Sequence, residues 1–334
     1  MDLMKLRPNF SMLAGLGQPQ QGFGNNMLNL GMLSQLFQGG NFNNCQTGGC
    51  FNRIQQAGQA NDLLGDGWNN IVSQGGVGNH AGWQGDNNEV IQQGRNNDIK
   101  GIIGDDNHVG QTGYNGQTAV QGRHNLVAQT GVNDSSSANG VSDMIRQYGS
   151  NGLATATGNH DQTTQYGNND CSRSQGSDNT VFQGNSRENS EIVGHDNAVA
   201  QRGQYNAAYV VGHDNTVAQG GNSSNAVVIG ENNHVTDNAS DNQATVRGKN
   251  NNLDIEGNTG GDVFLKGDGI NAAYKNGQWS ATDADGHNVG VYRNDKGDTF
   301  IGQRPTNHVE GTDQNGYDTM PADFVREGKA DGVI

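Results

Sequence analysis

Hydrophobic and polar residues alternate along most of this chain in runs of five residues, and a glycine follows each run. In the run Asn215–Gln219, every second side chain faces the same way if the backbone is extended, because successive side chains of a strand point to opposite faces. The glycines recur every nine residues, with one additional residue between Gly94 and Gly104. Glycine permits the positive φ angles that tight corners need. The pattern therefore predicts short β-strands joined by corners rather than helices.

Two inward-facing positions show that the structural repeat is eighteen residues, or two runs. Gln occupies one of these positions in alternate runs, while Val or Ile occupies it in several of the runs between them, at Val120, Ile192, Val210, Val228 and Val246. The position two residues earlier is large beside Gln and small beside Val, as Val217 and Ala226 illustrate. Each coil therefore contains two unlike strands whose inward side chains interlock across a narrow core. We predict an all-β fold, a two-sheet β-solenoid with layers about 4.8 Å apart.

The inward Gln and the corner Asn residues are predicted to stack into ladders, with one copy in each layer. Each amide can bond to the copy in the neighbouring layer, which satisfies a buried polar group that would otherwise cost a few kcal/mol. The predicted Gln ladder consists of Gln111, Gln129, Gln147, Gln165, Gln183, Gln201 and Gln219. The corner Asn ladders include Asn197, Asn206 and Asn215.

The repeat also sets the expected boundaries of the chain's parts. Residues 31–266 are predicted to form the solenoid, with about 13 coils. Residues 1–30 are interpreted as an N-terminal capping or export segment. Residues 267–304 leave the glycine spacing and carry turn signals, so we predict a small β-meander that caps the solenoid. The polar residues 305–334 are predicted to be a flexible tail.

Composition and charge narrow the possible partners. The chain has 334 residues and a formal net charge of −15, and its 19 Lys and Arg residues are dispersed. Nucleic-acid binding needs clustered positive charge, so we expect no nucleic-acid partner. No segment is long and apolar enough to span a membrane. The first residues lack the apolar run of a cleaved signal peptide, so we expect an extracellular or cell-surface protein that is exported without one.

Acidic and histidine residues form one candidate site for a metal ion. Asp178, Asp196 and Asp214 are eighteen residues apart and should lie in adjacent layers, with His195 and His213 beside them. Carboxylates about 5 Å apart repel unless something neutralises them, which suggests a surface site for a divalent cation. The alternative, which we favour, is a solvated ladder screened by salt. We expect no other cofactor.

Catalysis is not expected of this chain. Enzymes that cleave polysaccharides need paired carboxylates, or a cluster of Lys, Arg and Tyr, in a cleft. The Asp and Glu residues here are scattered over the corners and the C-terminal tail. The sequence therefore predicts no enzyme and no catalytic residues.

The repeat element Asn-x-Val-x-Gln-x-Gly resembles the curlin repeat of bacterial amyloid fibre subunits, here with half-repeats of nine residues. Clear copies are Asn125–Gly131 and Asn215–Gly221, and the resemblance covers residues about 38–235. It implies a secreted β-solenoid of biofilm matrices, with Gln and Asn ladders inside.

These observations lead us to expect a secreted structural or adhesive protein of the extracellular matrix or cell surface. Its partners would be copies of itself, joined end to end or laterally, or a polysaccharide or protein of a surface. The alternative is a harpin-like effector exported by a type III machine, in which the solenoid is a repeat domain. An N-terminus that is not cleaved, together with the high Gln, Asn and Gly content, would suit that route.

Overall fold

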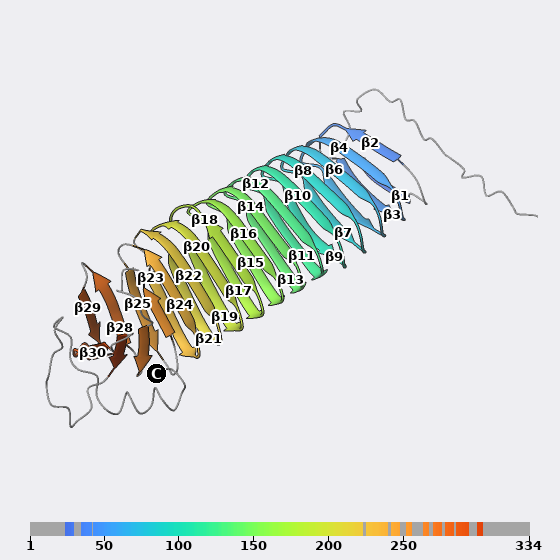
Figure 1. The fold of residues 1–334 in the computed structure, drawn as a ribbon. Helices are drawn as coiled ribbons and strands as arrows, with labels where there is room; N and C mark the ends of the chain where they lie inside the picture. The colour runs from blue at the N-terminus through green and yellow to red at the C-terminus, as the bar shows by residue number, and fades with distance from the viewer. Residues whose placement is uncertain are drawn as a thin grey trace, which may run out of the picture. The chain divides into compact units, whose positions relative to one another are not determined.

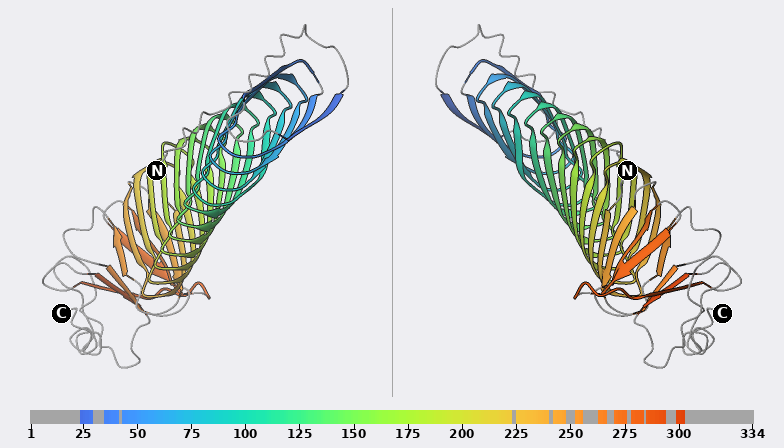
Figure 2. Two further views of the ribbon diagram at one scale, coloured as in Figure 1. Left: turned by 90° about the vertical axis from the view of Figure 1, so that its right-hand side faces the viewer. Right: turned by 90° about the vertical axis from the view of Figure 1, so that its left-hand side faces the viewer.

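The computed structural model describes residues 24–29, 35–41, 43–222, 225–239, 242–247, 252–255, 263–266, 270–275, 278–283, 285–293 and 299–302. Its described secondary structure is all β, and the strands wind into a solenoid of two sheets, as predicted (Figure 1). The chain forms two compact units, residues 1–156 and residues 157–334. Within each unit the strands of successive coils lie side by side, which the further views in Figure 2 also show. The described part contains no helix that is long and apolar enough to cross a membrane.

In the first unit, odd-numbered and even-numbered strands form separate sheets. The odd-numbered strands are β1 (Gly24–Asn29), β3 (Asn43–Gly48), β5 (Asp62–Asp66), β7 (His80–Gln84), β9 (Asp98–Ile103), β11 (Gln117–Arg123) and β13 (Ser135–Val141). The even-numbered strands are β2 (Gln35–Gly39), β4 (Arg53–Gln59), β6 (Ile71–Val77), β8 (Glu89–Arg95), β10 (His108–Tyr114), β12 (Leu126–Val132) and β14 (Met144–Ser150). The boundary between the units falls within β15 (Leu153–Asn159). Neighbouring strands pair in parallel, and residues eighteen apart face each other, as Gln111 and Gln129 do.

A β-bulge accounts for the additional residue in the glycine spacing. In the pairing of β9 with β11, Lys100 and Gly101 together lie opposite the single residue Ala119. Gly101, the second of these two residues, has a φ of 73°, a left-handed conformation that glycine adopts at no steric cost. Ile99 and Ile102, on either side, are 0% and 1% exposed. The additional residue is therefore absorbed at the surface, and the inward pattern resumes without a change.

The second unit has the same two-sheet arrangement. Its odd-numbered parallel strands are β17 (Cys171–Ser177), β19 (Asn189–His195), β21 (Ala207–His213), β23 (Asn225–Glu231) and β25 (Asn242–Arg247). Its even-numbered parallel strands are β16 (Gln162–Asn168), β18 (Thr180–Gly184), β20 (Ala198–Gln204), β22 (Thr216–Asn222), β24 (His234–Ala239) and β26 (Asn252–Ile255).

Antiparallel strands end both sheets of the second unit. β28 (Ile270–Lys275) pairs antiparallel with β25, and β29 (Gln278–Thr282) pairs antiparallel with β28. On the other sheet, β27 (Val263–Lys266) pairs antiparallel with β26, β31 (Thr299–Gly302) pairs parallel with β27, and β30 (Gly290–Arg293) pairs antiparallel with β31. Residues 267–304, predicted to form a meander, contribute β28 and β29 to one sheet and β30 and β31 to the other, while β27, which covers β26, lies within the range predicted for the solenoid. The last parallel strand of each sheet is thus paired and not left as an open edge. The predicted tail 305–334, and residues 1–23 of the predicted N-terminal segment, lie outside the described residues.

The corners explain why glycine recurs at a fixed spacing. The second residue after a corner glycine often has a positive φ, such as 56° at Asn69 and 55° at Asn87, which Asn tolerates well. The glycine itself is required by the close approach of successive coils. At Gly212, where φ is 140°, an added Cβ would lie 1.7 Å from the carbonyl oxygen of Gly194. An alanine at position 212 would therefore push the adjacent coils apart.

The interior of each unit contains the Gln column that the sequence predicts to stack. Nε2 of Gln129 lies 2.7 Å from Oε1 of Gln111 in the first unit, and Nε2 of Gln201 lies 2.8 Å from Oε1 of Gln183 in the second. Each Nε2 also donates to a backbone carbonyl of the facing strand, as Gln201 does to Ala207 at 2.9 Å. The Gln residues of the predicted ladder are at most 3% exposed, so these bonds satisfy amides that have lost contact with water.

Corner Asn side chains tie adjacent coils together in the same way. Oδ1 of Asn215 accepts bonds from the backbone N–H and from Nδ2 of Asn197, at 3.0 and 3.1 Å. Nδ2 of Asn215 donates in turn to the carbonyl of Gly194 at 3.1 Å. Asn206 occupies the opposite corner of the coil, where its Nδ2 donates to the carbonyl of Gly220 at 3.2 Å. The Asn residues named in the sequence thus belong to two columns, one at each corner.

Candidate functional sites on the corners of the solenoid

The residues predicted to bind a metal ion lie at the corners that lead from odd-numbered to even-numbered strands in the second unit. Asp178, Asp196 and Asp214 have φ angles of 56°, 55° and 56°, so they occupy equivalent corner positions. The rings of His195 and His213 stack with their centroids 5.0 Å apart and their planes inclined by 2°. The structure therefore brings these residues into the adjacent layers that their spacing predicts.

Each carboxylate in the column of Asp178, Asp196 and Asp214 lies close to one histidine ring. Nδ1 of His195 lies 2.9 Å from Oδ2 of Asp196, and Nδ1 of His213 lies 2.8 Å from Oδ2 of Asp214. The hydrogen bond from His213 is the main reason that the pKa of Asp214 is lowered. Asp178 lies 3.6 Å from Nε2 of His160. These groups are about half exposed, so each pair contributes little to stability. In two of the three layers the carboxylate has a hydrogen bond to a histidine ring, and binding of a cation that would neutralise the column stays a prediction.

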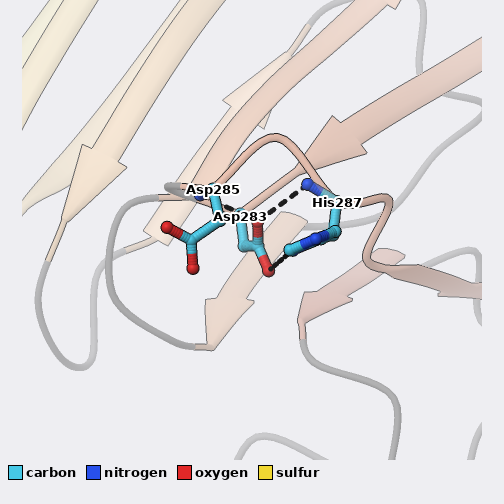
Figure 3. A group of neighbouring side chains, drawn as sticks. All are labelled: Asp283, Asp285 and His287. Atoms are coloured by element: carbon cyan, nitrogen blue, oxygen red, sulfur yellow. Dashed lines mark hydrogen bonds and ion pairs between the residues drawn. The ribbon is translucent and has the colours of Figure 1, made fainter.

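Among the described residues, three potential metal-ligand atoms gather within 4.8 Å of one another at Asp283, Asp285 and His287 (Figure 3). Oδ1 of Asp283 accepts bonds from the backbone N–H groups of Asp285 at 3.0 Å and of His287 at 2.9 Å. The N–H of His287 is the largest cause that lowers the pKa of Asp283. The carboxylate of Asp283 is thus engaged in shaping the turn between β29 and β30. In the sequence, this turn was signalled only by Asp285-Gly286.

Buried carboxylic acids occupy corner positions that hold Asn in other coils, and sequence reasoning missed them. Glu188 and Asp170 are 1% and 2% exposed, at the position where Asn206 stands one coil after Glu188. Burial raises the pKa of Glu188 to about 8, and the charge of Asp170 contributes to that rise. In the first unit, burial also raises the pKa of Asp134 and of Asp143. The signal available in the sequence was their spacing: each lies three residues after the position that holds the corner glycine in most coils, where the Asn ladder residues otherwise stand.

A groove of about 360 Å³ crosses three successive coils of the first unit. It is lined by Asn69, Asn70, Ile71, Asn87, Asn88, Glu89, Asp106 and His108. The first residues of β6, β8 and β10, which pair in register, contribute to this lining. The corner residues with positive φ, Asn69, Asn87 and Asp106, also contribute to it. The remaining two residues are buried members of the Asn ladder. The groove was not predicted, because its residues are distant in sequence and meet only through the coil register.

Two exposed aromatic side chains belong to the coil that precedes this groove and to its first coil. Phe51 has a φ of 58° and holds the corner position that Asn69 holds one coil later. Its ring meets the ring of Trp68 edge to face, with centroids 5.0 Å apart and an interplanar angle of 67°. The two side chains are 44% and 46% exposed. Positive φ recurs at the corners of successive coils, and a large aromatic residue is an uncommon occupant of such a position.

No protein-family model, curated protein or solved structure matches this chain. The function of the chain is therefore inferred from the arrangement of its own residues.

Proposed function

We propose that this chain is a secreted structural or adhesive protein of the extracellular matrix or cell surface, in which the solenoid itself is the functional element. The observation that carries the proposal is the contrast between a uniform interior and a variable exterior. Inside the first unit, amides such as those of Gln129 and Gln147 bond from coil to coil at 2.8 Å. Outside, one position changes in successive coils from Ile71 to Glu89 to His108. A rigid stack that displays a varied surface suits support and attachment.

The amide ladders also support a curlin-like organisation of the repeat. Identical amides stacked at the layer spacing stabilise repeated β layers in fibrous assemblies. In the second unit, Gln183, Gln201 and Gln219 each donate to the preceding Gln at 2.8 Å. The proposal includes this likeness as a shared way of building a stable repeat.

The adhesive role rests on the side chains that the corners present to solvent. Aromatic residues supply large contact area at low cost in side-chain entropy, and they are enriched where proteins bind partners. Tyr114 and Tyr205 are 53% and 59% exposed, although both are large enough to bury considerable area. The proposal assigns the chain binding and support, and it assigns no catalytic step.

Localisation in the organism that makes the protein tests this proposal. Immunogold labelling in electron micrographs, with fractionation of cells, matrix and medium, would show where the chain accumulates. We expect it in the matrix or on the cell surface. Accumulation only in the cytoplasm would contradict the proposal. Recovery from the interior of a second, recipient cell would favour the exported effector instead.

A further inference from the structure

We propose that the groove of the first unit, together with Phe51 and Trp68, binds a linear uncharged polysaccharide that lies along the direction in which the coils stack. The groove is built from equivalent positions of successive coils, so its polar groups repeat at the layer spacing of about 4.8 Å. A partner that uses such a repeat must itself be an extended polymer. The inference names a partner for the adhesive role, and it rests on the proposed function.

The hydrogen-bonding groups of the groove suit sugar hydroxyls. The side chains of Asn69, Asn87, Glu89 and His108 make no hydrogen bond or ion pair with the described part of the chain, and they are partly or largely exposed. An Asn amide both donates and accepts, and a carboxylate accepts two bonds, which matches the paired donors and acceptors of neighbouring hydroxyls. Asn70 and Asn88 beneath them are occupied by the ladder, as the bond from Nδ2 of Asn70 to Oδ1 of Asn88 at 3.1 Å shows. The free groups are therefore those that face the groove.

The aromatic pair supplies the apolar contact that a sugar ring needs. Each sugar ring has faces of C–H groups, which pack on aromatic rings, while its hydroxyls point outward to polar neighbours. Phe51 stands in the same corner column as Asn69 and Asn87, so a polymer that follows this column passes from aromatic to amide side chains. Trp68 precedes Asn69 directly, and its exposed ring is held by edge contact with Phe51. A binding site that combines apolar contacts with several polar groups fixes the orientation of its ligand.

Two other classes of polymer, peptides and polyanions, fit the groove poorly. An extended peptide binds a sheet by adding a strand to a free edge. The strands here have no free edge at the groove, since β6 and β8 pair with neighbours on both sides. An acidic polysaccharide or a nucleic acid would meet Glu89 and Asp106, in a chain with a formal net charge of −15. An uncharged chain of hydroxyl groups avoids both difficulties.

Tryptophan fluorescence of the full-length protein provides the measurement. The chain has 3 Trp residues, and Trp68 is 46% exposed whereas Trp83 is 2% exposed, so a ligand in the groove should alter the emission of Trp68 first. The probes are the hexasaccharides of β-1,4-linked glucose and of β-1,4-linked N-acetylglucosamine, with a hexasaccharide of galacturonic acid as the acidic comparison. We expect saturable binding of at least one neutral probe and none of the acidic probe. Because variants without Trp68 lose the fluorescence signal, their affinity for the same probes is measured by calorimetry.

Two substitutions remove different parts of the site. Trp68→Ala removes the stacking surface, and we expect affinity to fall about tenfold or more. Asn87→Gly removes an amide from the groove while keeping a residue that favours positive φ, so it should weaken binding without lowering the melting temperature. The matched control is Tyr209→Ala, which removes an exposed aromatic side chain from strand β21 of the second unit and should leave affinity unchanged.

Several results would overturn the groove assignment. These are no binding of either neutral probe, binding of the acidic probe alone, or unchanged affinity in both Trp68→Ala and Asn87→Gly. The proposed function fails separately, because it depends on localisation in the producing organism. Neutral-glycan binding by a chain found only in the cytoplasm would refute the secreted role and leave the groove in place. A chain that is found in the matrix but binds neither neutral probe would refute the groove assignment and leave the proposed function in place.

Discussion

Replacing Glu188 by Gln should remove a pH dependence that is built into the second unit. Both carboxylate oxygens of Glu188 are buried without a hydrogen-bond partner in the described part of the chain, and the charge of Asp170 acts on them. The pKa of Glu188 rises from 4.5 to about 8 on folding, chiefly through burial. Between these values the folded protein holds a proton that the unfolded chain has released. The contribution of Glu188 to stability is therefore greatest below pH 4.5 and falls as the pH rises to about 8.

The size of the effect follows from the rise in pKa. Stability should fall by about 1.4 kcal/mol for each pH unit within this window, or about 4 to 5 kcal/mol in total. Local relaxation and entry of water reduce such energies, so we expect a loss of at least about 2 kcal/mol in the measurement. Gln has the same length as Glu and no charge at any of these pH values. The variant should match the wild type near pH 5 and exceed it in stability at pH 8.

Urea denaturation followed by circular dichroism at pH 5, 6, 7 and 8 measures this difference. Asp134 and Asp143 in the first unit also have raised pKa values, so the wild type and the variant share that part of the pH dependence. The control is Glu231→Gln, which changes an exposed Glu in the second unit and should stay within about 0.5 kcal/mol of the wild type at each pH. Equal stability of the Glu188→Gln variant and the wild type at pH 8 would refute the reasoning.

Three further predictions concern the packing of the coils. Gly212→Ala should destabilise the protein by at least about 2 kcal/mol, whereas Gly220→Ala, whose Cβ would meet nothing within 4 Å, should be close to neutral in the same urea denaturation. Gln183→Ala removes buried bonds to both neighbouring coils and should cost about 2 to 5 kcal/mol, while the exposed Gln175→Ala should cost less than about 0.5 kcal/mol. Deleting residues 270–302 removes the strands that pair with β25 and β27, and size-exclusion chromatography should then show larger assemblies than the intact chain forms at the same concentration. A deletion variant that elutes as the intact chain does would contradict the capping role of these strands.

The interior of the coil could be predicted from the sequence because stacking makes the inward positions periodic. Val217 and Gln219 recur in kind every eighteen residues, since each inward side chain packs on its equivalents in adjacent layers. The additional residue after Gly94 was visible as well. The bulge at Gly101 that absorbs this residue could not be predicted, because the sequence does not say whether a coil widens at a corner or within a strand.

The candidate sites were harder to predict, and the reason differs from site to site. Glu188 was overlooked because a carboxylate in a polar repeat suggests a solvated side chain, whereas its corner position places it inside. Phe51 and Trp68 gave no signal because their contact depends on two corners that are seventeen residues apart in sequence. The column of His195 and His213 was found because its spacing equals the coil.

The inward positions of the coil and the corner positions that face solvent differ in how far their residues can vary. This difference decides where a binding site can form in the fold. Gln183 donates to Gln165 and accepts from Gln201, so a change in its side chain disturbs the coils on both sides. At the corner, Asn87 is held to the next coil through its backbone N–H, which donates to the carbonyl of Asp105 at 3.0 Å. Its side chain is therefore free to change while the stack is retained. Binding sites on this solenoid should accordingly consist of equivalent positions in successive coils, as the groove does, and segments continuous in sequence should seldom form one.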